Sequence, residues 1–316
     1  MSSRSSAVVS TSFIVAVLAL GLGTGLVVGC TGPVESPQPA FDEAAWRQDV
    51  EAWHQRRIEA LHKPDGWLTL VGLFWLDDGD NRFGSDPSSD LVFPDKAPPI
   101  AGVFHVEDGK VSVTAEPGVD LEHDGEAVTE LTLVSDADAD GEPTVLSLGS
   151  LRFFVIDREG SLGIRLRDTE SPLLTSFEGI ERFPLDPALR LDGRFEPYDP
   201  PKSIAIPNVL GGTFNEESPG AVVFELAGRQ HRLDATAEAD GSLFVVFGDT
   251  TNGKETYGGG RFLTAEAPVD GHVVVDFNRA YDPPCVFTPY ATCPLPPPQN
   301  KLDVPILAGE KTYGHH

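Results

Sequence analysis

The chain has 316 residues, of which 40% are hydrophobic and 23% charged, a composition typical of folded domains. This length suffices for one large domain or two ordinary ones. The 49 acidic residues outnumber the 23 basic ones, and the formal net charge is -26. Because such a charge repels the phosphate backbone, we expect no nucleic-acid partner.

The first 29 residues have the pattern of an export signal. A single positive charge precedes an apolar run, residues 13–28, which ends in "LVVGC". This pattern predicts a secretory signal peptide over residues 1–29. The small residue before Cys30 resembles a bacterial lipobox and predicts that Cys30 carries lipid. The alternative is an uncleaved anchor, although the run is shorter than the roughly 20 residues a span needs.

These features predict a bacterial cell-envelope protein that attaches to the membrane through its lipid anchor. In lipoproteins of bacteria with two membranes, an Asp after the lipidated cysteine favours retention in the inner membrane. Thr31 stands at this position here, so the pattern permits an outer-membrane location. Residues 30–40, rich in proline and small polar side chains, are predicted to form an extended tether.

One amphipathic helix is predicted over residues 41–63. Its apolar residues recur on one face at helical spacing, at Trp46, Val50, Trp53 and Leu61. We expect the tryptophans to be packing anchors.

Beyond residue 63 the pattern changes to short strand-like runs, such as "GVFHV", "LRFFVIDR", "LFVVFGD" and "HVVVDFN". Eight Asp-Gly pairs punctuate the chain, and this dipeptide favours tight hairpin turns. Frequent short strands without alternating helices predict a mainly β protein with antiparallel sandwich or barrel architecture and one N-terminal helix.

Residues 64–167 loosely resemble a forkhead-associated β-sandwich. The resemblance rests on a glycine turn before "SDPSSDLVFP" and on later hairpin segments. Phosphothreonine readers of that family carry Arg after the turn glycine, whereas Ser85 follows Gly84 here. The resemblance therefore implies the fold and does not extend to phosphopeptide binding.

Residues 168–316 are predicted to form a second β domain. The stretches "GDTTNGKETYGGGRFL", "DFNRAYDPPCVFTPYATCPLPPPQNKL" and "AGEK" resemble the bacterial domain-of-unknown-function family numbered sixteen eighty-four. "PDGWLTLVGLFWL" and "SDPSSDLVFPDKAPPIAG" resemble it too. Asp282 stands where the family pattern leads us to expect Asn, and Gln299 where we expect Glu. The family implies no activity.

Two cysteines, Cys285 and Cys293, have seven residues between them in this proline-rich stretch. Because an exported protein meets oxidising conditions, we predict a disulfide between them. The stapled loop has two interpretations: a rigid platform that presents residues such as Asn278, Arg279 and Tyr281, or a lid tied across apolar surface. Metal binding needs two further ligands, and the nearest histidines are at the C-terminus.

The stretch "DADADGEP" resembles the beginning of a calcium-binding loop. Asp136, Asp138 and Asp140 match the first ligand positions, but Ser147 replaces the bidentate Glu. We therefore expect an acidic hairpin tip without tight calcium binding. The glycines of "YGGGRFL" precede a strand-like run, so a turn is expected there instead of a phosphate site. No cofactor is predicted.

Polar residues in two of the family motifs would meet at neighbouring strand ends if their strands pair. They are Asp249, Glu255, Tyr257, Arg261, Asp276, Asn278, Arg279 and Tyr281. Carboxylates beside arginines fit an acid/base pair or an anion grip, and equally fit ion pairs that close a barrel end.

Three functions remain open. The first is binding of a small polar or sugar-like ligand by an envelope protein. The second is a hydrolase that works through a carboxylate, with Glu255 or Asp249 as general base. The third is a structural envelope protein without a ligand.

Overall fold

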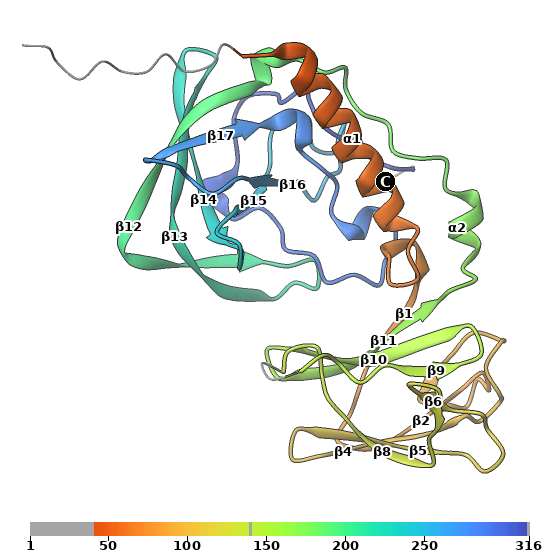
Figure 1. The fold of residues 1–316 in the computed structure, drawn as a ribbon. Helices are drawn as coiled ribbons and strands as arrows, with labels where there is room; N and C mark the ends of the chain where they lie inside the picture. The colour runs from red at the N-terminus through yellow and green to blue at the C-terminus, as the bar shows by residue number, and fades with distance from the viewer. Residues whose placement is uncertain (1–40, 139–140, 315–316) are drawn as a thin grey trace, which may run out of the picture. The chain divides into compact units, whose positions relative to one another are not determined.

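The structure, a computed structural model, describes residues 41–138 and 141–314. The helices and strands all lie in one unit that begins at Asp42 (Figure 1). The predicted signal peptide, the lipidation site Cys30 and the tether lie outside the described residues. Within the described part of the chain, no helix is both long enough and apolar enough to cross a membrane.

The main helix, α1 (Glu43–Leu61), confirms the predicted amphipathic helix. The Asp42 side chain accepts a hydrogen bond from the backbone N–H of Ala45 and caps the first turn. The buried face carries Trp46, Val50, His54 and Leu61.

Two sheets form from the first half of the body. Their strands are Leu70–Trp75 (β1), Gly79–Gly84 (β2), Leu91–Val92 (β3), Gly102–Glu107 (β4), Lys110–Ala115 (β5), Glu122–His123 (β6), Glu126–Ala127 (β7), Glu130–Leu133 (β8), Leu146–Leu148 (β9), Leu151–Arg158 (β10) and Ser161–Asp168 (β11). One sheet has the order β1-β11-β10-β9-β6-β7 and the other β3-β2-β4-β5-β8.

A shared apolar core joins these two sheets. Phe83 stacks on Phe104 with ring centroids 4.4 Å apart, and Phe93 and Phe153 pack around them edge-on or tilted. Alternation of side chains along each strand places these rings on the inner faces. The β4–β5 hairpin turns at Asp108–Gly109, where both residues have positive φ, as the Asp-Gly pattern predicted.

The second half of the body forms a third sheet, whose long curved hairpin β12–β13 is visible in Figure 1. Its strands are Arg190–Pro207 (β12), Thr213–Leu226 (β13), Arg229–Ala237 (β14), Leu243–Phe247 (β15), Arg261–Ala265 (β16) and His272–Asp276 (β17). Short helical segments connect the strands or follow them, at Trp67–Thr69 (η1), Pro172–Ser176 (α2), Pro187–Leu189 (η2), Phe277–Arg279 (η3), Pro284–Val286 (η4) and Pro298–Asn300 (η5).

The third sheet curves until its ends meet. Its order is β16-β15-β14-β13-β12-β17, so β16 and β17 are opposite edges and do not pair in the ladder. The chain just after β17 returns to β16 instead: Phe262 and Tyr281 exchange backbone hydrogen bonds of 2.8 and 2.9 Å. The condition that the two predicted strands pair is therefore not met, and the closure joins the backbone at Phe262 and Tyr281 instead.

The prediction of a mainly β, antiparallel protein with one substantial helix is confirmed. The first two sheets end at Asp168 and the third begins at Arg190, close to the expected change at residue 168. Independent folding of the two regions and the forkhead-associated likeness stay predictions.

Candidate functional site

Asp249 and Arg261 form a fully buried ion pair. An Arg261 Nη2 donor lies 2.8 Å from the Asp249 Oδ2 acceptor, and both side chains have 0% exposure. The other Asp249 oxygen accepts from the backbone and hydroxyl of Thr251. Arg261 also donates to the carbonyls of Ile306 and Ala308. The carboxylate has its hydrogen bonds filled, so these contacts favour a structural role over a general base.

Asp276 and Asn278 are also engaged in the fold. The Trp46 indole donates to Asp276 Oδ2 over 2.7 Å and ties α1 to the end of β17. Asn278, 1% exposed, accepts from the backbone N–H of Asp186 and donates to the carbonyl of the same residue. Arg279 pairs with Asp49 on α1. The stretch after β17 therefore anchors the helix to the sheet.

Glu255 and Tyr257 lie apart from these groups. Glu255 is exposed, and its backbone carbonyl accepts from the N–H of Thr312. Tyr257 is half-buried and packs with a cluster that contains Leu61 and Phe287. Burial raises the pKa of the Tyr257 phenol, and the charge of Asp282 adds to the rise.

Tyr281 is the predicted site residue that faces an aromatic cavity. The cavity has a volume of about 270 Å³. Its lining residues are Arg57, Trp67, Phe244, Phe262, Tyr281, Asp282, Pro284 and Phe287. The Arg57 guanidinium lies over the Tyr281 ring, 4.6 Å from its centroid. Concave sites with aromatic walls and a few polar groups are the usual form of small-ligand sites.

Asp282 is the unusual residue of this cavity, which we call the Asp282 cavity. The residue has no solvent exposure, and neither carboxyl oxygen has a hydrogen-bond partner in the structure. Burial raises the pKa of Asp282 to about 8, and the nearby charge of Glu310 raises it further against Arg57 and Arg261. At neutral pH the group is therefore mainly a carboxylic acid, with one donor and a free acceptor.

A bidentate ion pair supports this wall. Arg57 donates to both Glu310 oxygens, over 2.6 and 2.9 Å, and to the backbone carbonyl of Asp282 over 2.8 Å. Glu310 in turn accepts from the Asp282 backbone N–H. His54 lies 3.8 Å from Glu310, and burial lowers the pKa of its imidazole. The positive charge of Arg57 is thus already neutralised, which leaves Asp282 as the polar group without a partner.

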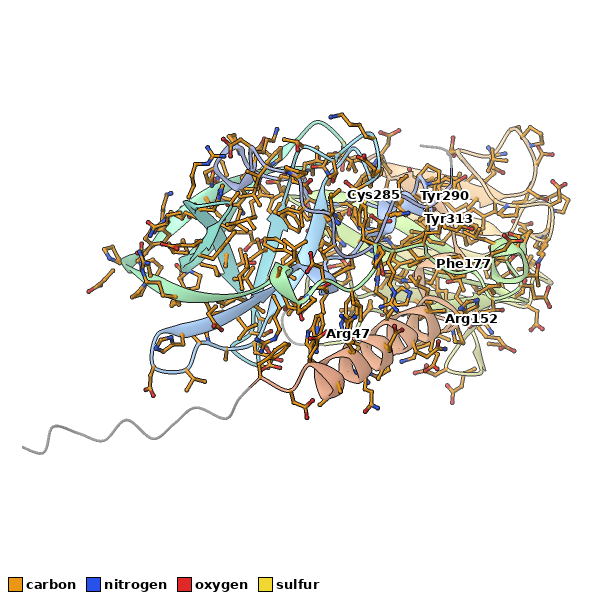
Figure 2. All side chains as sticks on the ribbon, turned by 90° about the horizontal axis from the view of Figure 1, so that it is seen from above. Arg47, Arg152, Phe177, Cys285, Tyr290 and Tyr313 are labelled. Atoms are coloured by element: carbon orange, nitrogen blue, oxygen red, sulfur yellow. A yellow bond between two sulfur atoms is a disulfide. The ribbon has the colours of Figure 1, made fainter. Side chains whose placement is uncertain are left out.

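The structure contains the expected disulfide between Cys285 and Cys293, whose Cα atoms are 6.2 Å apart. Cys285 is labelled in Figure 2. Cys293 and Ala291 pack on apolar residues of β1, β15 and β16. Pro284 and Phe287, which flank this part of the loop near Cys285, form part of the cavity wall. The loop covers apolar surface, as the lid interpretation expected, and it also shapes the Asp282 cavity.

The acidic stretch considered for calcium is partly used by the fold. Arg158 donates to both Asp136 oxygens, over 2.8 and 2.7 Å. Asp140 lies outside the described residues. Across the described residues, no group of three or more His, Cys, Asp or Glu side chains is placed to hold a metal ion. The arrangement at Asp136 is that of an ion pair at a hairpin.

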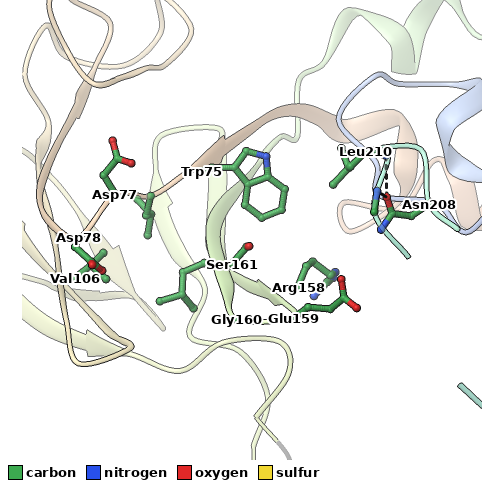
Figure 3. Close-up of a pocket in the computed structure, with 13 residues that line it drawn as sticks. Trp75, Asp77, Asp78, Val106, Arg158, Glu159, Gly160, Ser161, Asn208 and Leu210 are labelled. Atoms are coloured by element: carbon green, nitrogen blue, oxygen red, sulfur yellow. Dashed lines mark hydrogen bonds between the residues drawn. The ribbon is translucent and has the colours of Figure 1, made fainter. Parts of the chain in front are cut away.

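Two other cavities are larger than the Asp282 cavity, but polar groups in their walls such as Arg158, Asn208 and Asp249 are already hydrogen-bonded within the fold. One of about 650 Å³ has the Trp75 indole projecting into it, beside Arg158 and Asn208 (Figure 3). Arg158 is paired with Asp136, and the Asn208 side chain accepts from backbone N–H groups of its own turn. The other, of about 420 Å³, is lined by Asp249 and the glycine-rich turn. Neither contains a buried polar group without a partner.

The glycine-rich turn has a steric cause. Gly260 has a φ of +85°, and a Cβ there would lie 2.3 Å from the Pro296 side chain. The turn leads directly into β16, as the sequence predicted. Only glycine allows this close approach of the two family motifs.

Comparison with known proteins addresses the predicted family. Residues 175–311 match the model of a protein family of unknown function, DUF1684. The predicted resemblance to DUF1684 is confirmed over these residues. The stretches at 64–76 and 85–102, which also suggested the family, lie outside the match. No curated protein matches the chain.

A solved structure is also similar in sequence to part of the chain. It is the solution NMR structure of an uncharacterized protein from gene locus rrnAC0354 of Haloarcula marismortui. The two sequences are 31% identical, with 44% of this chain and 78% of that chain covered and a TM-score of 0.37.

Sequence reasoning found Tyr281 but missed the residues that complete its surroundings. Asp282 was noticed only as a departure from the DUF1684 pattern, and Glu310 lay within the "AGEK" motif without a role. Arg57 and Trp67 lie outside the matched segment. The signal that could have found Asp282 is an acidic residue between an aromatic residue and two prolines, shortly after a core strand.

Proposed function

We propose that this protein binds a small polar, ring-containing ligand, of which a sugar is the model, in the Asp282 cavity. The observation that carries the proposal is a completely buried carboxyl group without a hydrogen-bond partner, in the wall of an aromatic cavity. A buried polar group without a partner costs free energy, and such groups concentrate at functional sites.

The chemistry of the wall favours a neutral ligand with both apolar faces and hydrogen-bonding groups. Trp67, Phe262 and Tyr281 contribute aromatic surface to the wall. A protonated Asp282 can donate one hydrogen bond and accept another, as a ligand hydroxyl requires. Because no part of Asp282 is exposed, the ligand reaches the carboxyl through one bridging water or after a small movement of the wall.

The Arg57–Glu310 pair makes a strongly charged ligand less favourable. The Arg57 guanidinium and the Glu310 carboxylate already form two short hydrogen bonds with each other. A ligand carboxylate would have to compete with Glu310 for Arg57, and a ligand cation would have to compete with Arg57 for Glu310. The hydroxyl-rich class keeps this pair intact.

The ligand-binding proposal is tested by calorimetry with the full-length protein and a panel of mono- and disaccharides. A binder that raises the melting temperature identifies native-state binding. Asp282→Asn, which also presents one donor group and one acceptor, should retain affinity within a few-fold. Asp282→Leu, of similar size, should reduce affinity at least tenfold. Equal affinity in Asp282→Leu would overturn the role of this carboxyl.

Glu255→Gln provides the matched control, because Glu255 is an exposed carboxylate in the same motif region. Its affinity should equal that of the wild type. If no saccharide binds, but a compound of another class binds and Asp282→Leu abolishes that binding, the site survives and the ligand class is wrong.

A carboxylate-dependent hydrolase is the second candidate, with Asp282 in place of the predicted Asp249 or Glu255. The observation in its favour is the raised pKa of Asp282, about 8, which suits proton transfer near neutral pH. Nitrophenyl glycosides and esters test this function. Asp282→Asn should abolish turnover while binding persists; turnover that survives in Asp282→Asn removes the hydrolase.

The expected place of this activity is the bacterial cell envelope. The lipobox at Cys30 and the disulfide both suit an exported protein. A lipid anchor followed by an extended tether would hold the binding domain close to the membrane surface.

A further inference from the structure

A cluster of arginines lies on the outer face of the first sheet. Ile164 and Leu166 of β11 point into the apolar core, so Arg165 and Arg167 lie on the opposite face. Arg152 of β10 lies on the same outer face and is the direct cross-strand neighbour of Arg167. We call these three residues the arginine face.

The arginine face brings like charges together without a direct ion pair, although the charges of Asp65 and Asp136 act on Arg167 and Arg165 from a greater distance. Like charges directly opposite on neighbouring strands are destabilising. Among the described residues, no carboxylate lies within 4.0 Å of a cationic nitrogen of Arg152, Arg165 or Arg167. Acidic residues outnumber basic ones by 49 to 23 in this chain. The lack of direct ion pairs on this face is therefore not explained by a shortage of carboxylates in the chain.

Arg165 has the least satisfied guanidinium of the three. The residue is only 6% exposed, its Nε has no acceptor, and its Nη2 lies 3.4 Å from the Thr292 hydroxyl. Burial lowers the pKa of Arg165 to about 10, with Arg158 and Arg167 lowering it and Asp136 raising it. A buried charge without a counterion is costly.

Packing against Trp67 explains only part of this arrangement. The guanidinium carbons of Arg165 and Arg167 each lie 5.6 Å from the Trp67 ring centroid. This contact is attractive, but it uses the ring face and provides no acceptor for Arg165 Nε. Arg167 fills one donor with the Gly66 carbonyl over 2.6 Å. The nitrogen donors of Arg165 remain the unexplained feature.

We propose that the arginine face binds a small oxyanion group, such as a phosphate, sulfate or carboxylate, with Arg165 as its main donor. Guanidinium groups match such groups in charge and in the fork geometry of their donors. Thr292 supplies a hydroxyl beside Arg165. The site is on the opposite strand face from the sandwich core, and its arginines are not among the lining residues of the Asp282 cavity, although Trp67 belongs to both surroundings.

The test is titration of the full-length protein with sodium phosphate, sodium sulfate and sodium acetate in separate experiments, each against sodium chloride at the same ionic strength. Phosphate or sulfate should raise the melting temperature and bind by calorimetry, and chloride should not. Arg165→Gln should weaken anion binding at least tenfold. Anion stabilisation that equals the chloride control in the wild type would overturn the proposal.

Two further variants keep the outcome decisive. Arg152→Gln, at a half-buried position, should weaken binding several-fold and tests the face if Arg165→Gln fails to fold. Arg229→Gln removes an exposed arginine that pairs with Asp303 and should bind anions as the wild type does. Equal loss in Arg229→Gln and Arg165→Gln would indicate general charge screening and sink the site.

The source of the anion is resolved by comparing inorganic phosphate with a phosphate monoester, phenyl phosphate. Tighter binding of the ester indicates an anionic group on a larger ligand that also contacts Trp67. Equal binding indicates a free anion. Asp282→Leu should bind both probes normally, so failure of the cavity proposal and failure of this one are separable.

Discussion

Replacing Asp282 by Asn should stabilise the protein, and increasingly so as the pH rises. The folded protein holds the Asp282 proton up to a pKa of about 8, whereas an unfolded chain releases it near 3.8. Between these values unfolding releases a proton, so stability falls as the pH rises. Asn does not ionise, and it therefore removes this pH-dependent loss.

The magnitude follows from the displacement of the pKa. Each unit corresponds to about 1.4 kcal/mol. With an ordinary pKa of 3.8 and a folded pKa of about 8, the loss is roughly 2 kcal/mol at pH 5 and roughly 5 kcal/mol at pH 8. Asp282→Asn should therefore gain about 3–4 kcal/mol relative to the wild type between these two pH values. This figure is an upper bound, because the folded protein can relax around the charged form.

The assay is denaturant unfolding of both proteins at pH 5, 6, 7 and 8 at constant ionic strength. The difference in unfolding free energy should grow steadily with pH and level off above pH 8. Glu255→Gln, at an exposed position, should show no such trend. A difference that stays constant with pH, or that falls as the pH rises, would refute the assignment of a buried, protonated Asp282.

Three further predictions concern the disulfide, the buried ion pair and the lipid anchor. Reduction of the Cys285–Cys293 bond should destabilise the protein by about 2–3 kcal/mol, measured by thermal unfolding with and without reductant. Asp249→Asn leaves the buried Arg261 with an unpaired charge and should cost about 3–5 kcal/mol in denaturant unfolding. Cys30→Ser should abolish incorporation of radiolabelled fatty acid in the host cell.

Each of these has a control and a contrary result. Native mass spectrometry that finds both thiols free would remove the disulfide. Asp303→Asn breaks an exposed pair and should cost no more than about 1 kcal/mol; if it costs as much as Asp249→Asn, burial of the Asp249 pair has no special effect. Undiminished labelling of Cys30→Ser would place the lipid elsewhere or show that there is none.

Local sequence patterns predicted many of the strands well. "LRFFVIDR" and "RFLTA" coincide with β10 and β16, because alternating apolar residues and adjacent turns define both strands. The long strands β12 and β14 were not predicted. Half of β12 is exposed or interrupted by prolines, as in "EPYDPPKS", so its apolar alternation is weak. Its pairing with β13 and β17 supplies the order that local pattern lacks.

The candidate site was predicted only in part, because its residues come from distant segments. Sequence reasoning grouped Asp249 and Arg261 with six other polar residues of two motifs, on the condition that their strands pair. It could not assign the ionisable groups to their partners. Trp46 reaches Asp276 across 230 positions, and Arg57 reaches Glu310 across 253. Such contacts decide which carboxylates are satisfied and which one is left without a partner.

The sequence pattern led us to expect Asn at position 282, and the environment of Asp282 gives that expectation a physical meaning. A protonated carboxyl and a carboxamide have nearly the same shape and both offer a donor and an acceptor. Burial beside Glu310 keeps Asp282 in the protonated form near neutral pH, so it can do there what the expected Asn would do. Asp282 loses that equivalence when it ionises, above about pH 8. Ligand binding by the wild type should therefore weaken above this pH, while binding by Asp282→Asn should not; parallel pH profiles for the two proteins would show that the carboxyl proton has no part in recognition.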